Sequence, residues 1–230
     1  MRILPRKRIE SPERILPDKR SLYDYYDDFE SYSIGSDGSP NWTPIESEGI
    51  KAFLVEEGGV GKIYKSQLGL GMTPPGIRRA LFNNNQNLDD VKVIMKTKAY
   101  WIGTGNVYVG TLIRNEDVFF SVFGKNGYFF RIIFRTTGSM VEIYKILNDG
   151  TGLRLGQVVT LGVHRNEWFE MVCEAKGSQL KLETIFASET LTLIVIDSSY
   201  TVGEMAILTS VDEGSIGRTM EVDDIRIQEI

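Results

Sequence analysis

The chain has 230 residues, of which 42% are hydrophobic, 10% aromatic and 25% charged, a composition typical of a globular protein and not of a disordered one. Its 26 basic and 31 acidic residues give a net charge of −5, which argues against a nucleic-acid binder that works through overall charge. The single cysteine, Cys173, and the single histidine, His164, exclude a disulfide framework, thiol-rich metal sites and sites that need two imidazoles.

Membrane and export signals are also missing from the sequence. No apolar run approaches the roughly 18 residues of a membrane span, and the N-terminal residues lack the apolar stretch of a signal peptide. We therefore expect a protein without a membrane span and, if Met1 is the native start, one that is not exported by the general secretory route.

Residues 1–22 are predicted to form an extended basic arm in front of one folded domain at residues 23–230. Pro5, Pro12 and Pro17 interrupt the arm, and its apolar residues are sparse. Residues 1–20 carry seven basic and three acidic side chains, a net charge of +4 that leaves −9 for the remainder. The basic side chains are Arg2, Arg6, Lys7, Arg8, Arg14, Lys19 and Arg20. We expect this arm to dock onto a protein partner, either a sister subunit or another part of an assembly; the alternative is a solvated tail.

From residue 50 onward, short segments rich in Val, Ile, Tyr, Phe and Thr are separated by Gly, Asn, Asp and Ser, the pattern of strands joined by tight turns. Strands are predicted near 50–56, 60–68, 91–101, 105–114, 117–123, 127–136, 139–147, 155–162, 167–175, 179–187, 190–197, 203–209 and 219–229. Gly and Asn residues at 125–127, 137–138, 148–152 and 176–178 predict hairpins. A short helix is predicted at residues 77–82, the one segment in which helix-forming residues follow one another. The sequence therefore predicts an all-β, antiparallel two-sheet sandwich.

Alternation along the strand at 127–136 assigns its two faces. The residues expected on the core face are Tyr128, Phe130, Ile132 and Phe134, and the opposite face carries Phe129, Arg131, Ile133 and Arg135. Glu142 and Tyr144 on the next strand are expected to lie beside the second set. Aromatic rings stack on sugars, and arginine makes bidentate hydrogen bonds, so this basic, aromatic surface is a candidate site for a glycan or an acidic protein. The candidate ligand-binding residues are Phe129, Arg131, Arg135, Glu142 and Tyr144; a solvated face with ordinary cross-strand pairs is the alternative.

Several segments, in order, resemble those of concanavalin A-like lectin/glucanase domains of the laminin-G type. The segment 27–36, followed by Asn41-Trp42-Thr43, is similar to the opening strand and loop of that family. Further matches lie at 87–91, 110–114, 127–130, 166–169, 197–204 and 222–227, so the resemblance spans about residues 25–230. It implies a jelly-roll sandwich with Trp42 and Trp168 at core positions.

The resemblance also implies that the first and last strands lie side by side, which brings Asp28 and Asp223 together. Similar glucanases bind a structural calcium ion through the aspartate that matches Asp223 and through backbone carbonyls. Oxygen ligands suit Ca²⁺, and two adjacent carboxylates repel each other without a cation. A structural Ca²⁺ at Asp28 and Asp223 is therefore the cofactor hypothesis, and solvated carboxylates at a strand edge are the alternative.

Catalytic residues are not evident. Glucanases of this fold carry Glu-x-Asp-x-x-Glu or Glu-x-Asp-x-Glu on one strand, because alternate residues point into the same cleft, and neither motif occurs here. The carboxylate pairs that lie two residues apart fall on the terminal strands or in a loop; they are Asp28/Glu30, Glu46/Glu48 and Glu221/Asp223. Similar lyases use His or Tyr as a base, but His164 is expected to be an exposed histidine in a hairpin loop. We expect no enzymatic activity.

Three functional hypotheses follow. The first is a non-enzymatic structural protein, a virion component such as a capsid decoration or fibre-base protein that is anchored by the arm and displayed on the virion surface. The second is a carbohydrate-binding module, and the third is a polysaccharide-cleaving enzyme, either a glucanase or a lyase. Because this fold hosts all of these, the arrangement of particular side chains has to decide between them.

Overall fold

The computed structural model describes residues 24–45, 53–68, 77–83, 87–103, 105–118, 124–159, 162–164, 166–211 and 215–230, so the predicted arm at 1–22 lies outside the described residues. The strands are β1 (Tyr25–Asp27), β2 (Trp42–Pro44), β3 (Phe53–Glu57), β4 (Lys62–Leu68), β5 (Ile77–Phe82), β6 (Val91–Gly103), β7 (Val107–Asn115), β8 (Gly127–Arg135), β9 (Gly138–Ile146), β10 (Gly152–Val159), β11 (Trp168–Lys176), β12 (Gln179–Ile185), β13 (Thr190–Ile196), β14 (Glu204–Val211) and β15 (Ser215–Glu229). No helix among the described residues is long and apolar enough to cross a membrane.

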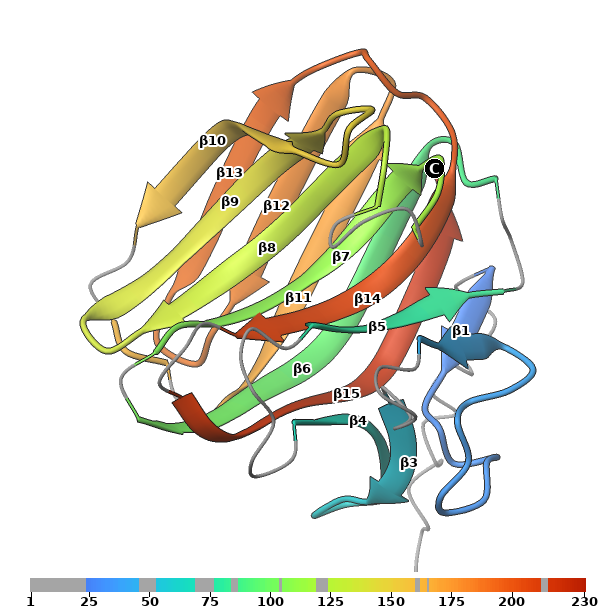
Figure 1. Ribbon diagram of the computed structural model, residues 1–230, viewed down its shortest axis with the longest axis vertical. Helices are drawn as coiled ribbons and strands as arrows, with labels where there is room; N and C mark the ends of the chain where they lie inside the picture. Colours follow the sequence, from blue (N-terminus) through green and yellow to red (C-terminus); the bar gives the residue numbers. More distant parts are fainter. Residues whose placement is uncertain are drawn as a thin grey trace, which may run out of the picture.

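The strands form two antiparallel sheets that are layered one on the other (Figure 1). Sheet A has the order β13-β12-β11-β6-β15-β4-β3, with β1 also paired to β15, and sheet B has the order β10-β9-β8-β7-β14-β5-β2. The pairing of β1 with β15 joins Tyr25 to Ile227, so the first and last strands do lie side by side. The prediction of an all-β, antiparallel two-sheet sandwich is confirmed.

A single apolar layer lies between the sheets. From sheet B it receives Tyr128, Phe130, Ile132 and Phe134 of β8, the residues that alternation assigned to the core. From sheet A it receives Phe169, Met171, Cys173 and Ala175 of β11. Because full burial of one large apolar side chain stabilises the fold by about 1.5–3 kcal/mol, this layer fixes which face of each strand turns outward.

The hairpin turns also match the sequence pattern. Asn126 and Gly177 adopt φ angles of 49° and 52° in the turns before β8 and β12. This left-handed region is the one that tight hairpin turns use and that Asn and Gly tolerate best.

Two expected elements differ from the structure. Residues 77–82 are not helical but form β5, which pairs with β14 and β2. Ala80 and Phe82 of β5 point into the main core, and Leu81 is buried on the other side of the sheet, so the segment lacks the alternation that marks a half-exposed strand. The strand expected at 117–123 is also not observed at Asp117 and Val118, and residues 119–123 lie outside the described residues.

Trp168 is a further correction, because it is not part of the core. It is partly exposed on the outer face of sheet A, where the Lys96 and Lys98 ammonium groups lie 5.4 and 5.9 Å from its ring centroid. Phe169, the next residue along β11, takes the core position instead. Trp42, by contrast, is fully buried, as expected.

One buried cation joins four segments at the end of β7. The Arg114 side chain is fully buried, and its Nε donates a hydrogen bond to the Asp89 carbonyl at 3.0 Å. Its Nη1 donates to the carbonyls of Gly177 and Tyr200 at 2.8 and 3.2 Å, and its Nη2 donates to Asp90 Oδ1 at 2.8 Å. A buried guanidinium that satisfies three carbonyls and a carboxylate ties the β7 end to the connections before β6, β12 and β14.

We expect Arg114→Met to lower the free energy of unfolding by roughly 3 kcal/mol, because the three carbonyls and Asp90 lose their donor. Urea unfolding of the purified chain measures this change. Arg135→Met is the matched control, since Arg135 is partly exposed and its Nη2 lies 4.0 Å from the Met140 sulfur. Equal unfolding midpoints for the two variants would contradict a stabilising role for Arg114.

Candidate functional site

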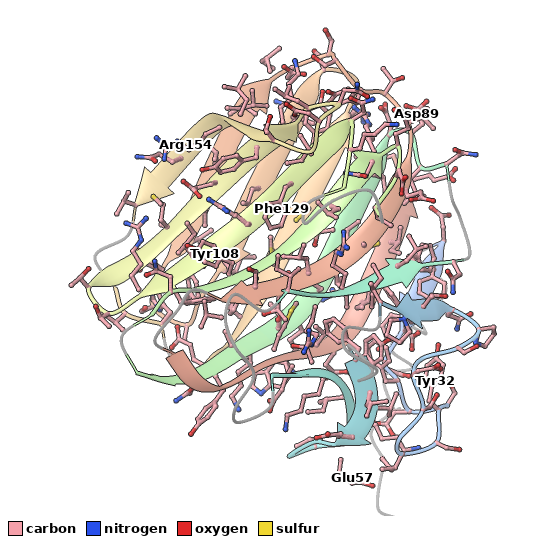
Figure 2. The ribbon with its side chains drawn as sticks, viewed as in Figure 1. Tyr32, Glu57, Asp89, Tyr108, Phe129 and Arg154 are labelled. Carbon is pink, nitrogen blue, oxygen red and sulfur yellow. The ribbon has the colours of Figure 1, made fainter. Side chains whose placement is uncertain are left out.

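The candidate site lies on the outer face of sheet B, which is the face turned away from the apolar layer. Strand register places Arg154 of β10 opposite Tyr144 of β9, and Tyr144 opposite Phe129 of β8. The neighbouring row places Gln157 opposite Glu142, and Glu142 opposite Arg131. Figure 2 shows Tyr108, Phe129 and Arg154 on this same sheet, so residues from four strands, β7 to β10, contribute to one surface.

Glu142 is the centre of the charged contacts. Its side chain is 1% exposed, and its Oε2 lies 2.8 Å from Arg131 Nε and 2.6 Å from Arg131 Nη2. Its Oε1 accepts a hydrogen bond from Arg154 Nη1 at 3.2 Å. A buried carboxylate requires such charge-assisted partners, so the pair fixes the position of both guanidinium groups.

Aromatic rings surround the Arg131 guanidinium. Its Cζ lies 4.3 Å from the centroid of the Tyr144 ring, 5.0 Å from that of Tyr108 and 5.7 Å from that of Phe129. Arg131 Nη2 also donates a hydrogen bond to the Tyr144 hydroxyl at 3.0 Å. Tyr108 and Tyr144 are partly exposed, so this cation–π arrangement presents two ordered tyrosines at the surface.

The five predicted ligand-binding residues share the outer face of sheet B but differ in depth. Arg131, Arg135 and Tyr144 are partly exposed. Phe129 is only 1% exposed and packs with Leu112 and Leu208 in a second apolar cluster. The expectation that its ring is open to a ligand is therefore wrong. Glu142 is equally buried, and it holds the two arginines in place beneath the surface. Ligand binding by this set stays a prediction.

Tyr108, Arg154 and Gln157 were not among the predicted site residues. The predicted strand began at residue 155, whereas β10 begins at Gly152, so Arg154 fell outside it. Tyr108 lay in a correctly predicted strand, but only the order of β7, β8 and β9 in the sheet shows that its ring reaches Arg131. Alternation gives the face of a residue, while its neighbours depend on sheet topology.

Glu142 has no second carboxylate beside it on its own strand. The alternate positions on β9 are Met140 and Tyr144, and Glu142 is the one carboxylate that the described residues of β7–β10 place on the outer face. Hydrolysis of a glycosidic bond by two carboxylates needs a pair about 5–10 Å apart. This surface does not provide that pair.

His164 was expected to be an exposed turn histidine, and the structure contradicts this. Its side chain is 5% exposed, and its ring stacks on Phe186 with the centroids 3.8 Å apart. Nδ1 lies 2.5 Å from Glu167 Oε1, and Nε2 lies 2.6 Å from Glu189 Oε1. His164 therefore joins the β10–β11 connection to the β12–β13 turn, with both ring nitrogens engaged.

The two predicted calcium ligands interact electrostatically. Burial raises the pKa of the Asp223 carboxyl, and the neighbouring charges of Asp224 and Asp28 add to this, against the opposing effects of the Asp224 backbone amide and Lys96. The described residues, however, contain no group of three or more His, Cys, Asp or Glu side chains that is suited to a metal ion. Because backbone carbonyls can also supply oxygen ligands to Ca²⁺, the calcium hypothesis at Asp28 and Asp223 stays a prediction.

Comparison with solved structures identifies the fold. The chain superposes on the carbohydrate binding module CBM66 from Bacillus subtilis with a TM-score of 0.56 and 14% identity, covering 82% of this chain and 95% of that one. The fold is that of the concanavalin A-like lectins and glucanases. The β-glucanase from Bacillus licheniformis matches with a TM-score of 0.56 and 13% identity, over 90% of this chain and 98% of that one.

The legume lectin-like domain from Entamoeba histolytica matches this concanavalin A-like chain with a TM-score of 0.55 and 11% identity, over 83% of this chain and 90% of that one. No family model matches the sequence. No curated protein matches it either. At these identities the likeness shows a concanavalin A-like fold and leaves the function to the site.

We expect Asp223→Asn to raise the melting temperature at pH 7. The pKa of the Asp223 carboxyl is higher in the folded than in the unfolded state, so the stability of the protein falls as the pH rises through these two pKa values. At neutral pH the charged carboxylate is therefore unfavourable in the folded protein. The gain should vanish at about pH 3, where the carboxyl is protonated in both states.

Asp149→Asn is the control of opposite sign. The Thr151 hydroxyl and backbone amide hydrogen-bond to the Asp149 carboxylate and lower its pKa, so this variant should be less stable at pH 7. The opposite outcome is that added calcium raises the melting temperature of the unmodified chain and that Asp223→Asn removes that effect. This result would support the calcium hypothesis and contradict the expectation that Asp223→Asn stabilises the protein at pH 7.

Proposed function

We propose that the chain is a non-catalytic glycan-binding module and that the outer face of β7–β10 holds the sugar. The observation that carries the proposal is the pair of partly exposed rings, Tyr108 and Tyr144, on either side of the Arg131 guanidinium. A sugar has apolar C–H faces that stack on aromatic side chains such as tyrosine. Its hydroxyl groups form hydrogen bonds with polar side chains beside those rings.

The polar side chains at this surface suit the same ligand. Arg154 and Gln157 of β10 are exposed; Arg154 lies directly opposite Tyr144, and Gln157 lies opposite Glu142. Arg131 already holds the Tyr144 ring by a hydrogen bond and a cation–π contact, so little rotamer freedom is lost when a sugar binds. A preorganised aromatic surface with polar groups at its border supports binding.

Catalysis has less support. Glu142 is buried and contacts two arginines, and Met140 and Tyr144 occupy the alternate positions on its strand. The chain is therefore better explained as a binding protein, although enzymes and binding modules share its fold.

The virion hypothesis has less support than the glycan hypothesis. It depends on the arm at 1–22, which lies outside the described residues, and the three structures compared above are named as a carbohydrate binding module, a glucanase and a lectin-like domain. These findings favour the glycan hypothesis over a capsid role.

We expect Tyr144→Ala and Tyr108→Ala each to weaken glycan affinity by about tenfold, because each removes one stacking ring. A glycan array identifies the sugar, and calorimetric titration measures the affinity. Trp168→Ala is the matched control, since it removes a partly exposed aromatic ring from the outer face of sheet A. An array on which the unmodified chain retains no sugar would contradict the proposal, as would an equal loss in all three variants.

A further inference from the structure

The outer face of β7–β10 carries an excess of positive charge. Its described side chains include three arginines, Arg131, Arg135 and Arg154, and one carboxylate, Glu142. The chain as a whole has a net charge of −5, so the sign of the charge on this surface is opposite to that of the whole chain. A local excess of guanidinium groups in an acidic protein points to an anionic ligand.

The outer face of sheet A differs, because several of its charges occur in pairs of opposite sign. Lys65 lies 3.2 Å from Glu56, Lys98 lies 3.4 Å from Glu221, and Arg226 lies 2.6 Å from Glu170. Such cross-strand pairs are the ordinary way in which a solvated sheet face balances its charge. The excess is therefore a property of one face and not of the fold.

Arg154 has donors to spare for a ligand. Its side chain is 49% exposed, and within the described part of the chain its hydrogen bonding is limited to Nη1, which donates to Glu142. The Nε and Nη2 donors on the same planar group make no hydrogen bond to the residues that the structure describes. Two N–H groups of one guanidinium match the two oxygens of a carboxylate or sulfate, so Arg154 is able to bind such a group bidentately.

Glu142 fixes the positions of the Arg131 and Arg154 guanidinium groups. Because it contacts Arg131 through one carboxylate oxygen and Arg154 through the other, the two guanidinium groups lie on either side of a single buried carboxylate. Register then places Arg154 directly opposite Tyr144. A sugar stacked on the Tyr144 ring would bring its substituents next to Arg154.

We propose that the site binds acidic glycans, meaning sugars that carry carboxylate or sulfate groups, and that Arg154 is the principal contact for the acidic group. This inference rests on the proposed glycan-binding function and adds the class of ligand. Both kinds of acidic group offer the same paired anionic oxygens, so the experiment has to separate them.

The test is calorimetric titration of the full chain with three oligosaccharides of equal length: a neutral β-glucan, an oligogalacturonate and a sulfated galactan. We expect one or both acidic sugars to bind about tenfold more tightly than the neutral one, with affinity falling between about 50 mM and 300 mM NaCl. Arg154→Gln should weaken acidic-sugar binding about tenfold, and Arg154→Lys should weaken it less, because a lysine keeps the charge but not the fork. The preference between uronate and sulfate shows which acidic group is the ligand.

Lys92→Gln is the matched control, since it removes one positive charge from β6 on the outer face of sheet A and should leave affinity unchanged. Equal binding of neutral and acidic sugars, unaffected by Arg154→Gln, would overturn this inference and leave the proposed function standing. No binding to any sugar would overturn both. Polyglutamate binding as tight as that of the acidic sugars would show an anion site without sugar recognition, and would also overturn the inference.

Discussion

Two sheets packed over one apolar layer constrain everything else in this molecule. Each strand must give alternate residues to the layer, as β8 does with Phe130 and Ile132, and the residues between them must turn outward. The inner faces therefore supply most of the apolar burial, and the two outer faces can differ in their chemistry. On sheet A several outer charges form pairs of opposite sign, whereas on sheet B two arginines contact one buried carboxylate.

That carboxylate organises the candidate site. A buried Glu142 is tolerable only with compensating donors, and Arg131 and Arg154 supply them from the two flanking strands. Once Arg131 is held there, its guanidinium lies against the Tyr144 and Tyr108 rings. The positions of two rings and two guanidinium groups thus follow from one electrostatic requirement, which is how a site built on rigid strands gains its order.

Properties that depend on the pattern along one strand could be predicted from the sequence. The all-β class, the hairpin turns and the two faces of β8 were all predicted correctly, because alternation and turn residues act locally. The pairing of β1 with β15 is not local, and it was expected only through the resemblance to a known fold.

Properties that depend on the neighbouring strand could not be predicted in this way. Residues 77–82 were interpreted as a helix because helix formers follow one another there, whereas β5 is buried on both faces at Ala80, Leu81 and Phe82. Phe129 and His164 were expected at the surface, but residues distant in sequence cover them: Leu208 packs in the cluster that buries Phe129, and Glu189 reaches His164. Arg154 joins the site only because β10 lies beside β9. Depth and partners are set by the sheet order, which a single sequence does not encode locally.

The sheet order also explains how one fold accommodates glucanases and binding modules at 13–14% identity to this chain. Alternating apolar residues maintain the sandwich, and many sequences satisfy that requirement. Chemistry on the outer face then depends on very few positions. A second carboxylate on the strand of Glu142 would have to stand at residue 140 or 144, where its spacing of about 6–7 Å would approach that of a catalytic pair. Here those positions hold a methionine and a tyrosine, so the place that hydrolysis would need for an acid is occupied by the ring that a sugar would stack upon.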